Sequence, residues 1–152
     1  MAHTLTHADQ ADILLVEDNP EDVELAVRAI SKTHLTNKIH VVSDGAEALE
    51  YLMAEGRYVH RRDAALPKVV FLDLKLPLVN GFEVLEHCRS HERLRRLPIV
   101  VLTSSRESQD VQRSFGLGAN SYIVKQVDYQ QFTSVVRESG VYWLMINQSA
   151  TG

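Results

Sequence analysis

Short runs of apolar residues recur along the chain, and each is followed by a segment whose apolar residues have helical spacing. The runs are continuous rather than alternating, as is typical of strands buried on both faces of a parallel sheet. They predict strands at residues 13–16, 39–43, 69–73, 99–103 and 122–124. The helical patterns predict helices that begin at Pro20, at residues 46–54, 82–91 and 109–115, and near Tyr129. Five such units predict an α/β fold, a doubly wound parallel sheet with helices on both faces.

Length and pattern together predict one domain. A chain of 152 residues has the size of one ordinary domain, and no repeat, low-complexity tract or Gly/Ser linker interrupts it. We expect a flexible segment at residues 1–10, a single domain at 11–147 with an extended C-terminal helix, and a tail at 148–152. The connection at residues 56–67 is polar, basic and longer than usual, so it is either a partner-contact loop or an idle insertion.

Composition and charge argue against several classes of protein. Hydrophobic residues make up 45% of the chain and charged residues 24%, as in an ordinary globular protein. The formal net charge of -4 gives nucleic-acid binding no electrostatic support. The apolar stretches are too short for a membrane helix, the N-terminus lacks the pattern of a secretory signal, and Cys88 is the only cysteine. We therefore expect a soluble protein of a reducing, cytoplasmic compartment, with neither a nucleic-acid nor a membrane partner.

Chemically active side chains follow the predicted strands, at the point where each strand ends. In an open parallel sheet the carboxyl ends of the strands meet at one edge, where ligands bind. Each such residue alone would be an ordinary surface group, but their joint placement favours one common site. The residues are Glu17 and Asp18 after the first strand, Asp73 at the end of the third, Thr103 at the end of the fourth and Lys125 after the fifth.

The three carboxylates of this group predict a Mg2+ site, because this ion prefers oxygen ligands, retained water and phosphate oxygens. With the ion bound, an oxygen of Asp73 could attack a phosphoryl group in line and form an acyl phosphate. The ammonium group of Lys125 would neutralise charge on the phosphoryl oxygens. Asp73 is therefore the expected nucleophile.

Four segments resemble the receiver domains of two-component response regulators. They are ILLVEDN at 13–19, FLDLKLPLVNGFEVL at 71–85, PIVVLTSS at 98–105 and YIVKQ at 122–126. Their motifs are specific in combination, and the resemblance covers residues 11–138. It implies a flavodoxin-like sheet with strand order 2-1-3-4-5, in a protein that accepts a phosphoryl group from a kinase phosphohistidine onto Asp73. Such a protein is not an enzyme with a separate substrate: it catalyses its own phosphorylation and autodephosphorylation.

The resemblance also implies a role for the residues around the acceptor. Glu17 and Asp18 hold the Mg2+ cofactor. An oxygen of Asp73 and the backbone carbonyl of Lys75 complete the protein ligands of the ion. The side chain of Lys125 pairs with the phosphoryl group.

Two further positions, Thr103 and Tyr122, match the switch residues of this family. The hydroxyl of Thr103 is expected to bond a phosphoryl oxygen while the ring of Tyr122 turns inward, which changes the surface formed by the fourth helix, fifth strand and fifth helix. Outside the family they would be a strand-end hydroxyl and a half-buried ring. The chain has Gln126 after Lys125 where the family usually has proline, so this peptide is either trans with a shifted loop or a strained cis bond.

A narrower resemblance concerns the partner. The 56–67 connection, the single-domain layout and the tail around Tyr142, Trp143 and Leu144 resemble the small response regulators that pair with phytochrome histidine kinases in cyanobacteria. This implies a phytochrome sensor kinase as partner and a role in light signalling. The C-terminal segment is apolar around more of its circumference than a surface helix needs, which favours a homodimer through this region. The alternative is that the segment folds over the domain core.

Two other functions stay open at this point. An Asp-nucleophile phosphatase uses the same acyl-phosphate chemistry, but it needs a nucleophile near the chain start and a second Asp two residues later, where this chain has Lys75. The other is a receiver-like interaction module that phosphorylation does not regulate, motivated by Gln126 and the basic connection. It requires the complete acidic site to be idle.

Overall fold

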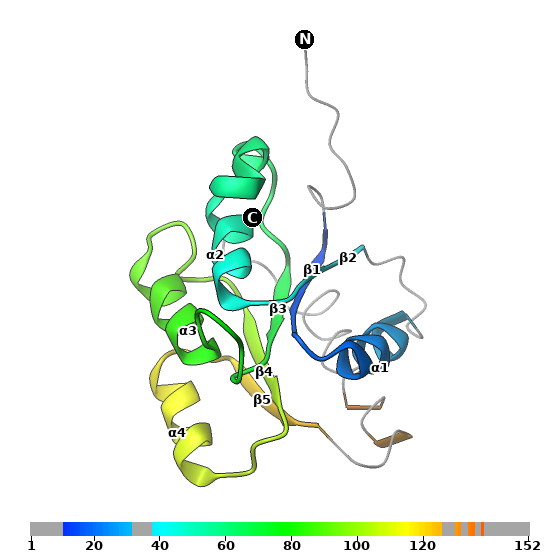
Figure 1. The fold of residues 1–152 in the computed structure, drawn as a ribbon. Helices are drawn as coiled ribbons and strands as arrows, with labels where there is room; N and C mark the ends of the chain where they lie inside the picture. Colours follow the sequence, from blue (N-terminus) through cyan, green and yellow to red (C-terminus); the bar gives the residue numbers. More distant parts are fainter. Residues whose placement is uncertain (1–10, 32–37, 126–129, 132–133, 136–137, 139–152) are drawn as a thin grey trace.

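The computed structural model describes residues 11–31, 38–125, 130–131, 134–135 and 138. Its strands are β1 Ile13–Val16, β2 Ile39–Val42, β3 Val69–Leu72, β4 Ile99–Thr103 and β5 Ser121–Val124. Its helices are α1 Pro20–Ser31, α2 Gly45–Met53, α3 Gly81–Ser90 and α4 Ser108–Gly116, with a 3-10 helix η1 at Gly56–Arg61. The strands form one parallel sheet in the order β2-β1-β3-β4-β5 (Figure 1), which confirms the predicted fold class and strand order.

The sequence placed the described elements to within one residue at every boundary it assigned. The short apolar runs mark the strands clearly because parallel strands covered on both faces contain few polar residues. The last predicted helix begins near Tyr129, which lies outside the described residues, but Gln130, Gln131, Ser134, Val135 and Glu138 are helical. The predictions for residues 1–10, for Gln126, for the apolar tail at 142–144 and for the tail at 148–152 also fall outside the described residues.

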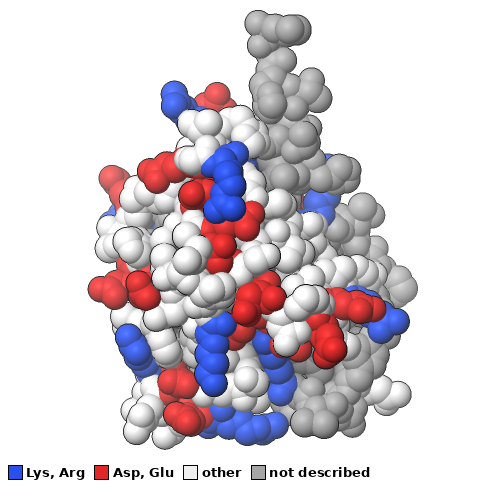
Figure 2. Space-filling view, in the orientation of Figure 1, with Lys and Arg blue, Asp and Glu red and all other residues white. Residues whose placement is uncertain are grey.

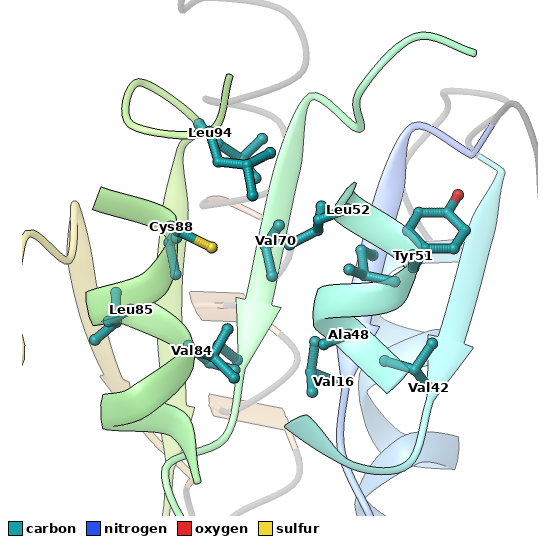
Figure 3. Close-up of a cluster of buried hydrophobic side chains, with 14 of the residues drawn as sticks. Val16, Val42, Ala48, Tyr51, Leu52, Val70, Val84, Leu85, Cys88 and Leu94 are labelled. Carbon is teal, nitrogen blue, oxygen red and sulfur yellow. The ribbon is translucent and has the colours of Figure 1, made fainter. Parts of the chain in front are cut away.

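Two hydrophobic clusters lie on opposite faces of the sheet. Within β1, Leu14 and Val16 belong to the cluster covered by α2 and α3 (Figure 3), whereas Ile13 and Leu15 belong to the cluster covered by α1. Figure 1 shows α1 on one side of the sheet and α2, α3 and α4 on the other. Every residue of β1, β3 and β4 is buried, so these strands form a rigid centre for the residues that follow them.

Cys88 lies within the first cluster, where it packs from α3 against the sheet (Figure 3). Burial raises the pKa of its thiol to about 12, the neighbouring charge of Arg89 opposing this effect only in part. A thiol that stays protonated is a poor nucleophile. Cys88 therefore has a packing role.

The connection after α2 is more ordered than a polar loop. It contains η1, and the side chain of Arg61 is fully buried although the segment is basic and polar in sequence. The guanidinium carbon of Arg61 lies 3.5 Å from the centre of the Tyr51 ring, and its nitrogens donate to the carbonyl oxygens of Tyr51 and Ala65. Burial is tolerated because the flat face of the guanidinium packs on an aromatic ring while its edge donates to the backbone.

Charges of both signs are interspersed on the face of the molecule in Figure 2. The three arginines of the connection after α3, Arg93, Arg95 and Arg96, are exposed, as expected of a solvated surface. Among the described residues no helix is both long and apolar enough to cross a bilayer.

Gly81 is the first residue of α3 and lies against the backbone of the residues that follow β3. A Cβ atom at this position would lie 2.3 Å from the carbonyl oxygen of Asp73 and 2.6 Å from Cα of Leu74. The φ angle of Gly81 is not positive, so the glycine is not needed for backbone freedom. The position needs the absence of a side chain, because α3 packs against the backbone of the strand end that carries Asp73.

Substitution Gly81→Ala is expected to lower the free energy of unfolding by about 2 kcal/mol, because a methyl group there must displace backbone atoms. The matched control is Gly116→Ala, since a Cβ at Gly116 would meet no atom within 4 Å. This control should change stability by less than about 1 kcal/mol. Urea unfolding followed by circular dichroism measures both. Equal stability of the two variants would contradict the close approach.

Candidate functional site

The ordered backbone at the carboxyl edge of the sheet brings the predicted site residues together. Hydrogen bonding across the sheet continues one residue beyond β1, β3 and β5, so the backbone of the residue after each of these strands is also held. Three backbone N–H groups donate across the sheet at this edge: Glu17 to the carbonyl of Val42 at 3.0 Å, Asp73 to that of Val16 at 3.0 Å, and Lys125 to that of Thr103 at 2.7 Å.

Glu17, Asp18 and Asp73 form an acidic cluster. Each offers one carboxylate oxygen, and these oxygens all lie within 4.8 Å of one another. Glu17 and Asp73 are buried, whereas Asp18 is exposed, so the cluster opens to solvent on the side of Asp18. A set of hard carboxylate oxygens with one open side fits Mg2+ or Mn2+, which keep water ligands. In the described part of the chain, His87 and His91 belong to no comparable group of three ligands.

Lys125 directs its ammonium group into this acidic cluster, with a side chain that is only 12% exposed. Its Nζ donates to Oε1 of Glu17, to Oδ2 of Asp22 at 2.8 Å and to Oδ2 of Asp73 at 3.5 Å. An ammonium group has three N–H donors, so three carboxylates can use its whole capacity. The structure therefore brings Lys125 next to Asp73, and its pairing with a phosphoryl group stays a prediction.

Burial and mutual contact shift the pKa values of Glu17 and Lys125. Burial is the main cause that raises the pKa of Glu17 to about 8, and the hydrogen bond with Asp73 adds to it, while Lys125 opposes it. For Lys125, burial alone lowers the pKa, but the hydrogen bonds to Asp22 and Glu17 outweigh it and raise the pKa to about 12. Lys125 therefore remains a cation, and the carboxyl of Glu17 takes up a proton more readily than an exposed acid does.

Asp22 was not among the residues predicted for the site. It lies in the first turn of α1, where an acidic residue is expected to stabilise the helix end, so its type and position gave no sign of a second role. Its place in the predicted fold could have indicated a role in the site. α1 begins four residues after β1 ends, so the first turn of α1 lies at the same edge of the sheet as Glu17.

Thr103 is the last residue of β4, and Tyr122 lies in the neighbouring strand β5. Thr103 is fully buried, and its Oγ1 is 3.4 Å from the backbone N–H of Ser105. The hydroxyl of Tyr122 donates to the carbonyl of Ser105 at 3.0 Å, and the hydroxyl of Ser105 donates to Asp110 at 2.6 Å. The connection from β4 to α4 is thereby tied to both predicted switch residues through Ser105.

The connection from β3 to α3 begins at Asp73. The N–H of Val79 donates to the carbonyl of Pro77 at 2.8 Å, and Leu78 between them has a φ of 67° and is 82% exposed. A three-residue turn whose central residue has a positive φ is rare and strained. Strained backbone of this kind is found more often at functional sites than elsewhere in proteins. The side chain of Lys75 is exposed at the start of the same connection. The role of its carbonyl as a metal ligand stays a prediction.

A sequence model of the response regulator receiver domain family matches residues 13–137. Among characterised proteins, the chain is 40% identical over 137 residues to the probable methanogenesis regulatory protein FilR2 of Methanothrix harundinacea, with 90% of this chain and 86% of FilR2 covered. It is 32% identical over 132 residues to the response regulator Rcp1 of Synechocystis, with 87% of this chain and 88% of Rcp1 covered.

Two solved structures have the same fold over nearly their whole length. The phosphorylated cyanobacterial phytochrome response regulator RcpA matches with a TM-score of 0.85 and 35% identity, covering 93% of this chain and 99% of RcpA. The Mn2+-bound form of Rcp1 matches with a TM-score of 0.83 and 30% identity, covering 91% of this chain and 98% of that one. The solved structures with this degree of similarity therefore include one phosphorylated protein and one protein with a bound divalent metal ion.

Metal binding at the acidic cluster is expected to weaken as the pH falls. Since the pKa of Glu17 is raised to about 8, its carboxyl is largely protonated at neutral pH, whereas a metal ion binds the carboxylate and must displace that proton. Titration calorimetry with Mn2+ should therefore show an affinity that rises between about pH 6 and pH 9 and a proton released on binding.

Glu17→Gln should weaken Mn2+ binding and remove this dependence on pH, while the control Glu21→Gln changes an exposed acid and should do neither. An affinity of the unsubstituted protein that stays constant across the same range of pH would contradict the raised pKa of Glu17.

Proposed function

This chain belongs to the response regulator receiver domain family, and on that premise we propose that Asp73 accepts a phosphoryl group from the phosphohistidine of a sensor kinase. The observation that carries the proposal is the position of Asp73, which is itself buried, in an acidic cluster with the ammonium group of Lys125 3.5 Å from its Oδ2. No other arrangement of acids in the described part of the chain combines three carboxylates in this way.

The reaction makes one bond and breaks one. An oxygen of the Asp73 carboxylate attacks phosphorus in line, the P–N bond of the phosphohistidine breaks, and the imidazole leaves with the electron pair and takes up a proton. The product at Asp73 is an acyl phosphate. Lys125 lies where it can pair with the phosphoryl oxygens, and its raised pKa keeps it charged for this purpose.

The residues present fit a divalent metal ion. Glu17, Asp18 and one oxygen of Asp73 would hold it, with the backbone carbonyl of Lys75 as the fourth protein ligand. When bound, the ion supplies positive charge that offsets the repulsion between the incoming phosphoryl group and the acids. We propose Mg2+, and the Mn2+ bound by the related Rcp1 supports a divalent ion at this place.

The acyl phosphate is then hydrolysed by water in the same site, so phosphorylation and autodephosphorylation both belong to the chain itself. The phosphatase alternative has little support, because the residue two positions after Asp73 is Lys75, whose side chain is exposed and is not an acid. We therefore regard the protein as a phosphoacceptor rather than an enzyme with a free substrate.

Signal output is proposed to pass through Thr103 and Tyr122. Once Asp73 is phosphorylated, the hydroxyl of Thr103 turns toward a phosphoryl oxygen and the contact with the 104–107 connection changes. Ser105 accepts the hydrogen bond of Tyr122 and donates one to Asp110 of α4, so a shift of this connection reaches both β5 and α4. The phosphoryl group favours one of two packings of these elements.

The partner is proposed to be a phytochrome histidine kinase, in a cytoplasmic light-signalling pathway. The likeness to RcpA and Rcp1 supports this assignment. The 40% identity with the probable methanogenesis regulatory protein FilR2 supports one alternative, a regulatory role outside light signalling. A homodimer through the C-terminal region is part of the same proposal.

Incubation with acetyl phosphate and Mg2+ is expected to add the mass of one phosphoryl group to the intact protein. Substitution Asp73→Asn should abolish the adduct, because an amide cannot form an acyl phosphate. The control Asp63→Asn changes an exposed acid outside the site and should leave the adduct unchanged. An adduct that persists in Asp73→Asn would place the acceptor elsewhere.

Thr103→Ala should separate phosphorylation from output. The variant retains Glu17, Asp73 and Lys125 and should still form the adduct, but it lacks the hydroxyl that reports the phosphoryl group to α4 and β5. Hydrogen exchange at residues 104–124 should change on phosphorylation in the unsubstituted protein and in the control Ser104→Ala. The same change in Thr103→Ala would show that the hydroxyl is not the relay.

A further inference from the structure

We propose that Asp22 is a positioning residue that holds Lys125 over the acceptor, an inference that rests on the proposed function and extends the site to α1. Its carboxylate accepts a hydrogen bond from Nζ of Lys125 at 2.8 Å. It lies outside the acidic cluster that fits the metal ion. Asp22 thus restrains the cation without serving as a metal ligand.

The three carboxylates that contact Lys125 differ in what else they must do. Glu17 and Asp73 belong to the acidic cluster, and their side chains are 3% and 10% exposed. A metal ion and a phosphoryl group would both interact with the oxygens of these two carboxylates. The side chain of Asp22 is 29% exposed, and neither the metal ion nor the phosphoryl group would use its oxygens. It is the one contact of Lys125 among these three that can persist through the whole reaction.

The backbone of Lys125 does not by itself fix the end of the side chain. Its backbone N–H donates to the carbonyl of Thr103 at 2.7 Å, which fixes the start of the side chain but not its four flexible bonds. The next residue is Gln126 rather than a proline, so no ring stiffens the backbone that follows. A lysine on such a backbone samples many rotamers unless an acid holds its end.

Asp22 is itself held in place by the start of α1. Oδ1 of Asn19 accepts hydrogen bonds from the backbone N–H of Glu21 at 2.9 Å and of Asp22 at 3.3 Å. This cap fixes the first turn of the helix against the end of β1. Asn19 therefore fixes the position of Asp22, and Asp22 in turn fixes the position of the ammonium group of Lys125.

A general stabilisation of the helix start is the competing explanation, and Glu21 separates the two. Glu21 and Asp22 are both acids of the first turn of α1, where negative charge is favourable. Glu21 is exposed, and no ion pair joins it to Lys125 in the described residues. Replacing Glu21 removes the same charge from the same turn while leaving the contact with Lys125 intact.

The first experiment measures Lys125 without metal or phosphodonor. The metal-free protein is treated briefly with an amine-acylating reagent, and the labelling of each lysine is read by peptide mass spectrometry, with exposed Lys68 and Lys75 as internal references. Relative to these, Lys125 should label slowly in the unsubstituted protein and in Glu21→Ala, and severalfold faster in Asp22→Ala. Labelling of Lys125 at the unsubstituted rate in Asp22→Ala overturns the proposal.

The second experiment measures phosphorylation by acetyl phosphate. Asp22→Ala should slow formation of the adduct by about tenfold, because a misplaced Lys125 no longer offsets charge on the phosphoryl group. Asp22→Asn keeps an oxygen acceptor without the charge, so its rate should be intermediate, and it also serves if the alanine variant does not fold. In a Lys125→Met background, Asp22→Ala should have no further effect.

A helix-stabilising role alone predicts the opposite pattern: equal slowing by Asp22→Ala and Glu21→Ala, and undiminished slowing in the Lys125→Met background. Either result overturns the positioning role, as does faster phosphorylation of Asp22→Ala. If the unsubstituted protein forms no adduct, the proposed function fails instead. The labelling of Lys125 then still decides whether Asp22 holds it.

Discussion

The contact between one ammonium group and the carboxylates around it is the interaction on which the whole site depends. Glu17 and Asp73 are buried at adjacent strand ends, and two close carboxylates with little access to water repel each other and lose hydration. Lys125 offsets part of this cost, and the raised pKa of Glu17 shows that it does not offset all of it. The clustered negative charge fits a divalent cation. In the proposed function, that cation allows the site to receive a phosphoryl group.

The parallel sheet makes this concentration of charge possible. The strand ends of β1, β3 and β5 are fixed by hydrogen bonds that run one residue past the strands, and the interior behind them is packed on both faces. Gly81 lets α3 start against the backbone of Asp73, so the acceptor has little freedom to move away from its neighbours. We propose that this frame stays fixed on phosphorylation and that movement occurs in the connection at 104–107, where Ser105 joins β5 to α4.

Much of this was predictable from the sequence, because buried parallel strands are continuous apolar runs and chemically active residues follow their ends. The strands, Asp73, its two acidic neighbours and Lys125 were found in this way. Asp22 was missed because an acid in a first helical turn already has an ordinary explanation. The burial of Arg61 was missed because its charge suggests solvent, and only the fold shows the Tyr51 ring that covers it. Contacts between a helix and a distant strand end leave no periodic signal in the chain.

The most direct test of the central claim is chemical identification of the residue that carries the phosphoryl group. After phosphorylation by acetyl phosphate, borohydride reduces an aspartyl phosphate to homoserine, which peptide sequencing by mass spectrometry locates. Homoserine is expected at position 73 and aspartate at position 18, although both carboxylates lie in the same cluster. Unreduced aspartate at position 73 in protein that carries the phosphoryl group, or homoserine at position 18, would contradict this expectation.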